Sequence, residues 1–322
     1  MTLTKSQPDQ SLHVYGTKVD IHKAVSSLSP KVQAAIPKYI NKGVDLGYIS
    51  PQNVQELMQI TNLTLEQLML DLVPFATAFA YPPISNFQVG AVVHGISGAL
   101  YLGANIEFVN EALSFCAHAE QSAIAHAINY GETGVDYLAI SAAPCGYCRQ
   151  FLYEILVQPG PPTYSDITIL LPNLPSVKLT DLLPNAFGPQ DLNVTTRLMQ
   201  PQNNKLQMVP PPTDPVIVAA LKAANSSYAP YTSDFSGVCI QTKSGQIYAG
   251  AYAENAAYNP SMSPLEAALI VFLMNQESFS DLSRAVLVEA SNSKCSQFDA
   301  TTNVLRSIAP NVNLQYYQAN VI

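Results

Sequence analysis

Residues 118–124 read His-Ala-Glu-Gln-Ser-Ala-Ile, and residues 144–148 read Pro-Cys-Gly-Tyr-Cys. Together they supply one imidazole, from His118, and two thiols, from Cys145 and Cys148. Three such ligands, with a fourth position left for water, are typical of a catalytic zinc site. The glutamate two residues after the histidine is placed to move protons beside the metal. These segments therefore predict a metal, a nucleophile and a proton shuttle together.

The sequence around these ligands predicts two helices. Residues 117–128 are rich in good helix formers, and residues 144–152 are typical of a strand end that turns into a helix. Cys145 and Cys148 are three positions apart, so they share a face of the first turn. The positive end of the helix dipole favours thiolates there. We therefore expect both cysteines to bind zinc, with Glu120 as the catalytic carboxylate.

Simpler explanations account for only part of this pattern. A lone His-x-Glu is usually surface chemistry, and a lone Cys-x-x-Cys can be a redox pair or half of a structural zinc site. A structural site needs four ligands, and the chain has no second Cys-x-x-Cys. A redox pair leaves His118 and Glu120 unexplained. The remaining cysteines, Cys116, Cys239 and Cys295, are expected to be small buried hydrophobes, and we do not expect Cys116 to compete as a ligand.

Composition excludes several classes of protein. The chain has 322 residues, a formal net charge of −8 and only 15 lysines and arginines, while 48% of its residues are hydrophobic. Phosphate contacts need clustered basic residues, so we expect no nucleic-acid partner. We find no signal peptide and no apolar stretch long enough to span a bilayer, so we expect no membrane partner. Unpaired cysteines beside a zinc–thiolate site favour a reducing, cytoplasmic location.

The order of the predicted elements favours an α/β fold. Helices are expected from Ser29 to Gly47, from Pro51, and from Thr64, where Thr64-Leu65-Glu66-Gln67 is a capping-box pattern. The expected strands are 87–93, 99–105, 137–141 and 167–171, with the two zinc-site helices between them. This ββαβαβ order implies a mixed sheet with helices packed on it.

Four regions are expected along the chain. They are residues 1–75, an N-terminal arm and helical segment; 76–190, the catalytic zinc domain; 191–215, a proline-rich linker; and 216–322, a second domain. About the first 25 residues are polar and weakly patterned, so we expect them to be loosely ordered.

The second domain repeats the first. Residues 81–87, 103–107 and 118–124 resemble 228–235, 250–254 and 264–270, at a nearly constant offset. In this alignment Pro264 matches His118 and Glu266 matches Glu120, while Cys295 alone remains of the cysteine pair. Proline cannot bind zinc. We therefore expect one zinc ion per chain, with the second copy as a scaffold.

With these residues in view, the chain closely resembles the zinc-dependent cytidine deaminases, from about Leu28 to its C-terminus. The motifs that carry the resemblance are Ser-Asn-Phe-Gln-Val-Gly-Ala at 85–91, Gly-Ala-Asn-Ile-Glu at 103–107, Cys-Ala-His-Ala-Glu-Gln at 116–121, Pro-Cys-Gly-Tyr-Cys-Arg-Gln at 144–150, Leu-Pro-Asn-Ala-Phe-Gly-Pro at 183–189 and Tyr-Ala-Glu-Asn-Ala-Ala at 252–257. The His-x-Glu and Pro-Cys-x-x-Cys pattern is the signature of zinc-dependent nucleobase deaminases.

The resemblance is to the long two-domain branch, which forms homodimers. It implies an α/β fold with a mixed five-stranded sheet sandwiched by helices, duplicated, with an N-terminal helical extension. In this branch the second domain of one subunit helps to complete the partner's active site. Residues 252–255 would then lie against the partner's catalytic domain.

The resemblance also assigns two residues to the sugar. Asn105 and Glu107 match residues that hydrogen-bond the ribose 3′-hydroxyl. An amide and a carboxylate can together donate to and accept from one hydroxyl. Without the resemblance, the same two residues would be explained as a turn at a strand end.

Four further positions are assigned to the base. Phe87 matches an aromatic that stacks on the pyrimidine, and Phe187 matches one that closes over it. The backbone around Ala119 and Ala143 would read the edge of the base. Without the resemblance, Phe87 would be explained as an aromatic in a core strand.

The implied reaction is hydrolytic deamination at C4 of cytidine and 2′-deoxycytidine, which gives the uridines and ammonia, as in pyrimidine salvage. Zinc-activated hydroxide would attack C4. Glu120 would take the water proton, protonate N3 and then protonate the departing amine.

Three rival functions are disfavoured. A deaminase of polynucleotide cytosine fits poorly with the acidic charge and with the sugar-binding pair Asn105 and Glu107. A guanine or nucleotide deaminase would lack that pair or add basic residues for phosphate. A catalytically silent zinc protein has no use for Glu120.

Overall fold

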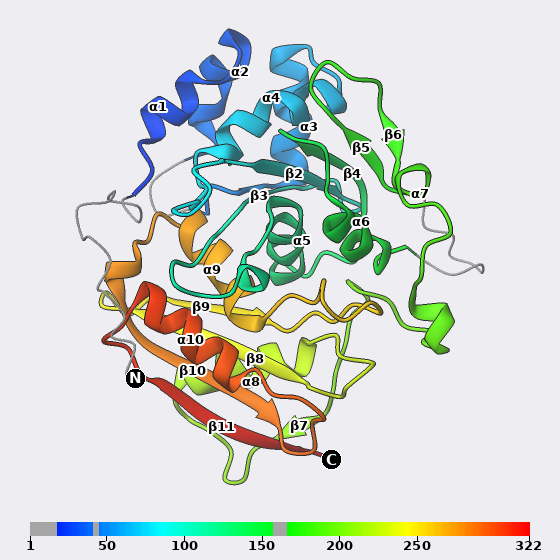
Figure 1. Cartoon of the computed structure of the whole chain (residues 1–322). Coiled ribbons are helices and arrows are strands. Elements are labelled where there is room, and N and C mark those ends of the chain that lie inside the picture. Colours follow the sequence, from blue (N-terminus) through cyan, green and yellow to red (C-terminus); the bar gives the residue numbers. More distant parts are fainter. Residues whose placement is uncertain (1–17, 41–44, 157–165) are drawn as a thin grey trace, which may run out of the picture.

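The computed structural model describes residues 18–40, 45–156 and 166–322, and over these ranges the chain forms two mixed β-sheets covered by helices (Figure 1). The predicted duplicated α/β fold with an N-terminal helical extension is confirmed. Within the described ranges, every helix falls short of the length and apolar character that a membrane span requires. Most of the arm that the sequence predicts as loosely ordered lies outside these residues.

The first sheet has six strands in the order β1-β3-β2-β4-β5-β6 over the described residues. They are β1 (Tyr48–Ile49), β2 (Gly90–Gly95), β3 (Leu100–Ala104), β4 (Val135–Ile140), β5 (Thr168–Leu170) and β6 (Val177–Lys178). Only the pair β4–β5 is parallel among them. The sheet has one strand more than expected because the short β1 joins its edge beside β3.

The second sheet repeats this arrangement with five strands among the described residues, in the order β7-β11-β10-β8-β9. They are β7 (Leu206–Gln207), β8 (Ser236–Thr242), β9 (Ile247–Ala251), β10 (Leu282–Ala290) and β11 (Leu314–Val321). The pair β10–β11 is parallel, like β4–β5. The edge strand differs in origin: β6 follows β5 along the chain, whereas β7 precedes β8 and lies within the stretch 191–215.

Equivalent helices cover equivalent faces of the two sheets. In the first copy α4 (Leu65–Thr77) and α5 (Ala119–Asn129) pack on the sheet, and in the second copy α8 (Pro215–Ser226) and α9 (Pro264–Met274) do so. Helices α5 and α9 also contact each other between the two sheets (Figure 1). One cluster of buried apolar side chains runs through this contact. The two copies therefore share a core.

The remaining helices connect these layers. They are α1 (Ile21–Ser26), α2 (Pro30–Ala35), α3 (Pro51–Thr61), α6 (Gly146–Tyr153), α7 (Leu179–Leu182) and α10 (Phe298–Ile308), with 3₁₀ turns at Ile36–Lys38, Leu113–Phe115, Pro189–Leu192 and Phe279–Asp281. Helix α6 lies between the parallel strands β4 and β5 in sequence, and α10 lies between β10 and β11.

Two N-terminal predictions need correction. Helix α1 lies within the predicted loose arm, and the Asp20 carboxylate caps it by accepting from the Lys23 N–H at 3.1 Å. The helix predicted from Ser29 to Gly47 is shorter, because α2 ends before Pro37, which has no N–H to donate to the preceding turn. The part of that prediction at residues 41–44 lies outside the described residues. The capping box predicted at Thr64 is confirmed, with Gln67 as its partner.

A glycine lets the central helix of each copy approach its sheet closely. A Cβ atom on Gly103 would lie 2.2 Å from the backbone nitrogen of Ala123 in α5. A Cβ atom on Gly250 would lie 2.3 Å from the backbone nitrogen of Ala268 in α9. Because the same contact recurs, Ala268 is the structural counterpart of Ala123.

The two helices also begin in the same way. His118 is the N-cap residue of α5 and Ser263 that of α9. The His118 N–H donates to Gln121 Oε1 at 3.2 Å, and the Ser263 N–H donates to Glu266 Oε2 at 3.0 Å. Each acceptor is the third residue of its helix.

This match corrects the sequence alignment by one residue. Ser263, not Pro264, is the counterpart of His118. Leu265 is accordingly the counterpart of Glu120. The prediction that the second copy keeps its glutamate was wrong, because the alignment ignored where the helix begins. The second copy has therefore lost both the histidine and the carboxylate of the first.

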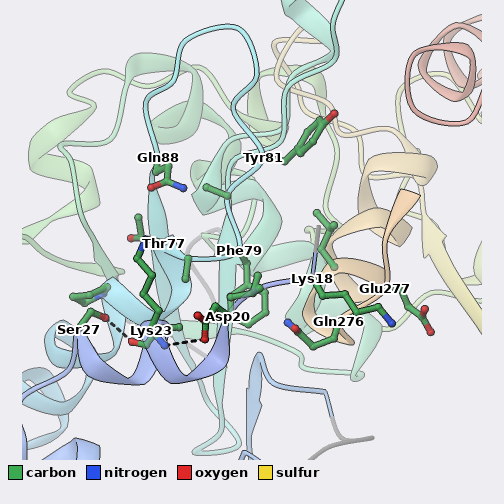
Figure 2. Close-up of a pocket in the computed structure, with 16 residues that line it drawn as sticks. Lys18, Asp20, Lys23, Ser27, Thr77, Phe79, Tyr81, Gln88, Gln276 and Glu277 are labelled. Carbon is green, nitrogen blue, oxygen red and sulfur yellow. Dashed lines mark hydrogen bonds between the residues drawn. The ribbon is translucent and has the colours of Figure 1, made fainter. Parts of the chain in front are cut away.

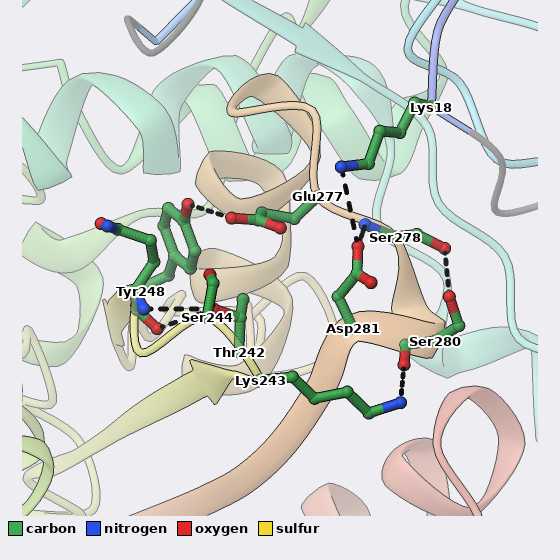
Figure 3. Close-up of polar contacts among 10 residues, drawn as sticks. Lys18, Thr242, Lys243, Ser244, Tyr248, Glu277, Ser278, Ser280 and Asp281 are labelled. Carbon is green, nitrogen blue, oxygen red and sulfur yellow. Dashed lines mark hydrogen bonds and ion pairs between the residues drawn. The ribbon is translucent and has the colours of Figure 1, made fainter.

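The N-terminal segment also contacts the second copy. Lys18 Nζ lies 4.0 Å from an Asp281 carboxylate oxygen, and nearby Tyr248 donates to Glu277 at 3.0 Å (Figure 3). A cavity of about 490 Å³ opens beside α1, the end of α4 and the end of α9, lined by Lys23 and Gln88 among others (Figure 2). The predicted zinc ligands do not line it.

Candidate metal centre and substrate cavity

The structure brings the three predicted metal ligands together at two helix N-termini. His118 is the N-cap of α5, Cys145 is the N-cap of α6, and Cys148 lies in the first turn of α6. His118 Nδ1 lies 3.5 Å from Cys145 Sγ and 3.2 Å from Cys148 Sγ, and the two sulfurs are 3.6 Å apart. These residues are the one His/Cys/Asp/Glu group in the described part of the chain that is arranged to hold a metal ion.

These spacings fit zinc. Tetrahedral zinc with bonds of about 2.3 Å to sulfur and about 2.0–2.1 Å to nitrogen places two sulfurs about 3.8 Å apart and a sulfur and a nitrogen about 3.6 Å apart. The observed spacings of 3.6, 3.5 and 3.2 Å lie within a few tenths of an ångström of these values. A disulfide would need about 2 Å between the sulfurs, and both cysteines are free. The donor set therefore suits a metal and not a disulfide.

The local environment prepares one thiol for metal binding. The side-chain contact with Cys148, helped by the N–H groups of Cys148 and Tyr147, lowers the pKa of Cys145 to about 5. The same contact and burial raise the pKa of Cys148. The lowered pKa favours the thiolate form of Cys145, which is the form that zinc binding requires.

Glu120 lies beside these ligands as the second residue of α5. Its side chain is 3% exposed, and burial raises its pKa. Glu120, His118 and Cys145 all line one cavity of about 280 Å³. A carboxylate with a raised pKa is suited to take up and release protons near neutral pH.

Most of the predicted substrate residues line the same cavity. They are Phe87, Asn105, Glu107, Ala119 and Ala143. Phe187 does not line it within the single chain; its side chain is 46% exposed, and its carbonyl accepts from Gln150 at 2.8 Å. The structure thus unites all of these predicted residues except Phe187.

Comparison with known proteins agrees with this site. Residues 64–159 and 179–302 each match the family described as cytidine and deoxycytidylate deaminase zinc-binding region. A cytidine deaminase of Shewanella pealeana is 42% identical over 89% of this chain and 94% of its own length. Those of Vibrio atlanticus and Vibrio cholerae are 42% and 44% identical, each over 83% of this chain and 88% of its own length. The chain belongs to the cytidine deaminases. It is a zinc-dependent hydrolytic enzyme with two copies of the deaminase domain.

In this cytidine deaminase the cavity wall is held by the two predicted sugar-binding residues. The Glu107 carboxylate accepts from the N–H groups of Ile84 and Ser85, each at 2.9 Å. Asn105 accepts from the Val89 N–H and donates to the Phe87 carbonyl, each at 2.9 Å. Both residues therefore stabilise the segment 84–89. This agrees with the alternative explanation from the sequence, in which Asn105 and Glu107 belong to a turn at a strand end.

The second copy of the deaminase fold keeps part of this hydrogen-bonded arrangement. Glu254 accepts from the N–H groups of Tyr231 at 2.9 Å and Thr232 at 3.3 Å, as Glu107 does in the first copy. The counterpart of Asn105 is Tyr252, and the second copy contributes no residue to the one metal-spaced group among the described residues. Because this arrangement persists in a copy without a metal site, it has a structural role in both copies.

Phe87 is not the core aromatic that the sequence allowed as an alternative, because 61% of its side chain is exposed. It also lines the cavity, so the exposed part of the ring is accessible to a ligand there.

Two of the three other cysteines also differ from expectation. Cys239 is buried, but Cys295 is exposed and Cys116 is only partly buried. Cys116 lines the cavity without joining the ligand group.

The deaminase also contains site neighbours that sequence analysis missed. Gln121, Tyr147 and Gln150 all hydrogen-bond the second copy from positions beside the metal ligands. The only signal in the sequence was the position of Gln121 three residues after an N-cap. Their partners lie more than one hundred residues away along the chain, beyond the reach of local patterns.

Proposed function

We propose that this deaminase converts cytidine and 2′-deoxycytidine to uridine and 2′-deoxyuridine. In this proposal His118, Cys145 and Cys148 hold one zinc ion and Glu120 is the proton shuttle. The observation that carries the proposal is a group of three zinc-spaced donor atoms beside one cavity of about 280 Å³, which is lined by two of the donor residues, His118 and Cys145, and by the buried Glu120.

When bound, zinc supplies Lewis-acid chemistry that makes water nucleophilic at neutral pH. Glu120 accepts a proton from the attacking water and passes it to N3 of the pyrimidine. It then delivers the second water proton to the amino group at C4, which leaves as neutral ammonia. The raised pKa of the buried Glu120 supports this role, because the carboxylate must both accept and donate.

Spare hydrogen-bonding capacity supports a sugar-binding role for Glu107 and Asn105. The Glu107 carboxylate has about four lone-pair sites, and the N–H groups of Ile84 and Ser85 and the Ser85 hydroxyl occupy three. Asn105 uses one donor and one acceptor on the chain. Each residue can therefore hold the loop and still bind the 3′-hydroxyl.

Charge at the cavity favours a nucleoside over a nucleotide. Among the described residues that line it, none is lysine or arginine, and Glu107 is acidic. A phosphate group would lie here without a cationic partner, so we propose that nucleotides and polynucleotides are poor substrates.

The base-binding roles rest on Phe87 and on the backbone of Ala119 and Ala143. Phe87 is an exposed aromatic on the cavity wall, and both alanines line the same cavity. Phe187, which lies off the cavity in the single chain, would close over the base only after another surface joins the site.

We propose that a homodimer provides that surface. Apolar side chains at the cavity and beside it are exposed, among them Phe87 (61%), which lines it, and Ile84 (44%), which precedes the lining residue Ser85. Exposed apolar patches of this kind mark interaction sites, and a two-fold dimer would cover them. The expectation that residues 252–255 face the partner needs revision, because Asn255 hydrogen-bonds Gln150 of its own chain. Another surface of the second copy would have to meet the partner.

The remaining proposals concern organisation and setting. We retain the division into residues 1–75, 76–190, 191–215 and 216–322, with β7 as a strand that the third region lends to the second copy. A cytoplasmic enzyme of pyrimidine salvage suits free cysteines and a nucleoside substrate.

The test is a deamination assay on the purified, zinc-loaded protein. Cytidine, 2′-deoxycytidine, deoxycytidylate and a single-stranded oligonucleotide would be compared by loss of pyrimidine absorbance. Turnover of both nucleosides, with little of the two phosphorylated substrates, is expected. Preference for deoxycytidylate would overturn the nucleoside assignment.

A further inference from the structure

A loop of the second copy lies against residues that flank the metal ligands of the first. It comprises residues 255–261, between β9 and α9. Its residues hydrogen-bond both helices that carry the ligands, α5 and α6. Among the described residues of the second copy no group is arranged to hold a metal ion, and Ser263 replaces His118. The loop therefore contacts the surroundings of the metal site in the other copy.

One end of the loop is anchored on α6. Asn255 Nδ2 donates to the Gln150 carbonyl at 2.9 Å, and the Ala256 N–H donates to a Glu154 carboxylate oxygen at 3.0 Å. Asn255 and Glu154 are both fully buried. Asn255 also accepts from the Ala257 N–H at 2.9 Å, which folds the loop back on itself. This end is therefore fixed relative to the cysteine-bearing helix.

The other end of the loop reaches the residues next to the ligands. Gln121 Nε2 donates to the Pro260 carbonyl at 3.0 Å, while Gln121 Oε1 accepts from the His118 N–H at 3.2 Å. The Tyr147 hydroxyl donates to the Asn259 carbonyl, and the Tyr147 ring lies 5.5 Å from the His118 ring, centroid to centroid. Tyr147 itself lies between the two ligating cysteines in sequence.

We propose that this loop holds His118 and the Cys145–Cys148 turn at zinc spacing, so that the second copy controls how firmly the first retains its metal. The inference rests on the ligands assigned under the proposed function. Tyr147 and Gln121 are positioning residues, because each hydrogen-bonds the loop and also contacts the metal ligand His118. Outer groups that orient metal ligands typically contribute about 10- to 100-fold in metal affinity.

The alternative is that these contacts only join the two copies. A matched control separates the two ideas. Asn129 Nδ2 donates to the Ala267 carbonyl at 3.0 Å, which is also a bond from α5 to the second copy. Asn129 is the last residue of α5, at the opposite end from His118. Its loss would weaken the junction without touching the metal site.

The experiment compares Tyr147→Phe, Asn255→Ala and Asn129→Ala in the full-length, zinc-loaded protein. Tyr147→Phe keeps the ring against His118 and removes only the hydroxyl. Asn255→Ala releases the loop from Gln150 and leaves the side chains of Gln121 and Tyr147 in place. Zinc loss to an excess of chelator is followed with a chromogenic zinc indicator, together with thermal unfolding and the visible spectrum of the cobalt-substituted protein.

We expect Tyr147→Phe and Asn255→Ala to lose zinc about 10- to 100-fold faster than the wild type, with an altered cobalt spectrum. Asn129→Ala should release zinc at the wild-type rate, even if its unfolding temperature falls. Wild-type zinc release in Tyr147→Phe and Asn255→Ala would overturn the inference. So would equal acceleration in Asn129→Ala, which would mark a general loosening. Full zinc retention in His118→Ala would instead overturn the ligand assignment and this inference with it.

Discussion

His126 Nε2 lies 2.9 Å from a carboxylate oxygen of Asp45, and both side chains are buried. His126 lies on α5, the helix that begins at His118, and its Nδ1 donates to the Leu102 carbonyl at 2.8 Å. Burial lowers the pKa of His126, but the charge of Asp45 and these hydrogen bonds outweigh it and raise the pKa. Burial raises the pKa of Asp45, and His126 outweighs it and lowers the pKa. The two residues therefore form a buried ion pair.

This pair should make the stability of the enzyme depend on pH. The raised pKa of His126 means that its contribution is complete below about 6.5, its ordinary value, and is lost as pH rises through the folded value. The lowered pKa of Asp45 means that its contribution is lost as pH falls below about 3.9 and through the folded value. The pair should thus stabilise the fold most between about pH 4 and 6.5.

The measurement is urea unfolding, within this pH range and above it. It compares the wild type with Asp45→Asn, His126→Gln and the double variant. Either single variant should lose about 3–5 kcal/mol near pH 6, because one buried charge stays unpaired. The double variant should lose less than the two single variants added together. The same dependence on pH in wild type and double variant would contradict the ion pair.

Replacing Glu120 tests the proton shuttle. Glu120→Gln should keep zinc and the unfolding temperature of the wild type, because the carboxylate lies outside the ligand group. Its kcat should fall by at least about 10²- to 10⁴-fold, the usual contribution of a general acid–base group. Metal content and steady-state kinetics on one preparation provide the measurement. Wild-type turnover in this variant would exclude the mechanism.

The metal content of the chain should be one zinc ion. Elemental analysis of the wild type checks this, since the counterpart of His118 in the second copy is Ser263. Cys145→Ala and Cys148→Ala should each lose most of the metal, whereas Cys239→Ala should keep it, because Cys239 is not in the ligand group. Two zinc ions per chain would show that the second copy binds metal after all.

Phe87 should contribute to substrate binding through its exposed ring. Stacking of a base on an aromatic side chain is worth about 1–3 kcal/mol, so Phe87→Ala should lower kcat/KM for cytidine by about 5- to 150-fold. Leu113→Ala is a suitable control, because Leu113 is 72% exposed but does not line the cavity. Equal losses in both variants would assign the effect to the exposed surface instead of the base.

A chain that ends at Asn204 should fail despite carrying every zinc ligand. It would lack α9, which packs on α5 through the shared apolar core, and the loop 255–261. The exposed face of α5 should make it insoluble, and any soluble fraction should be nearly inactive. Sedimentation and a deamination assay decide the point. A soluble, fully active fragment would show that the second copy is dispensable.

Part of the fold could be read from local sequence. The capping box at Thr64 and Gln67 was predicted correctly because both partners lie within one helical turn. The β2–β3 hairpin was predicted for the same reason, since its turn at 95–98 joins neighbouring strands. The edge strand β7 was not, because Leu206 pairs with Val321 at the other end of the second copy.

The alignment of the two copies shows the limit of pattern matching. Matching similar residue types aligned Glu266 with Glu120, and this alignment was wrong by one position. The N-caps His118 and Ser263 correct it, since hydrogen bonds at a helix start depend on backbone geometry that the letters alone do not reveal.

The metal site, too, was predictable from the sequence only in part. Cys145 and Cys148 belong to one helical turn, so their spacing alone places both sulfurs on one face. That, with Glu120 two residues after His118, was enough to predict the metal and the chemistry. The 3.2 Å approach of His118 to Cys148 joins two helices and depends on how they pack on the sheet. The contacts of the loop 255–261 depend on packing in the same way, because Asn259 and Pro260 reach the neighbours of the ligands only when α9 packs on α5. Contacts within a turn follow from chain geometry, whereas contacts between distant segments follow from burial of a shared core.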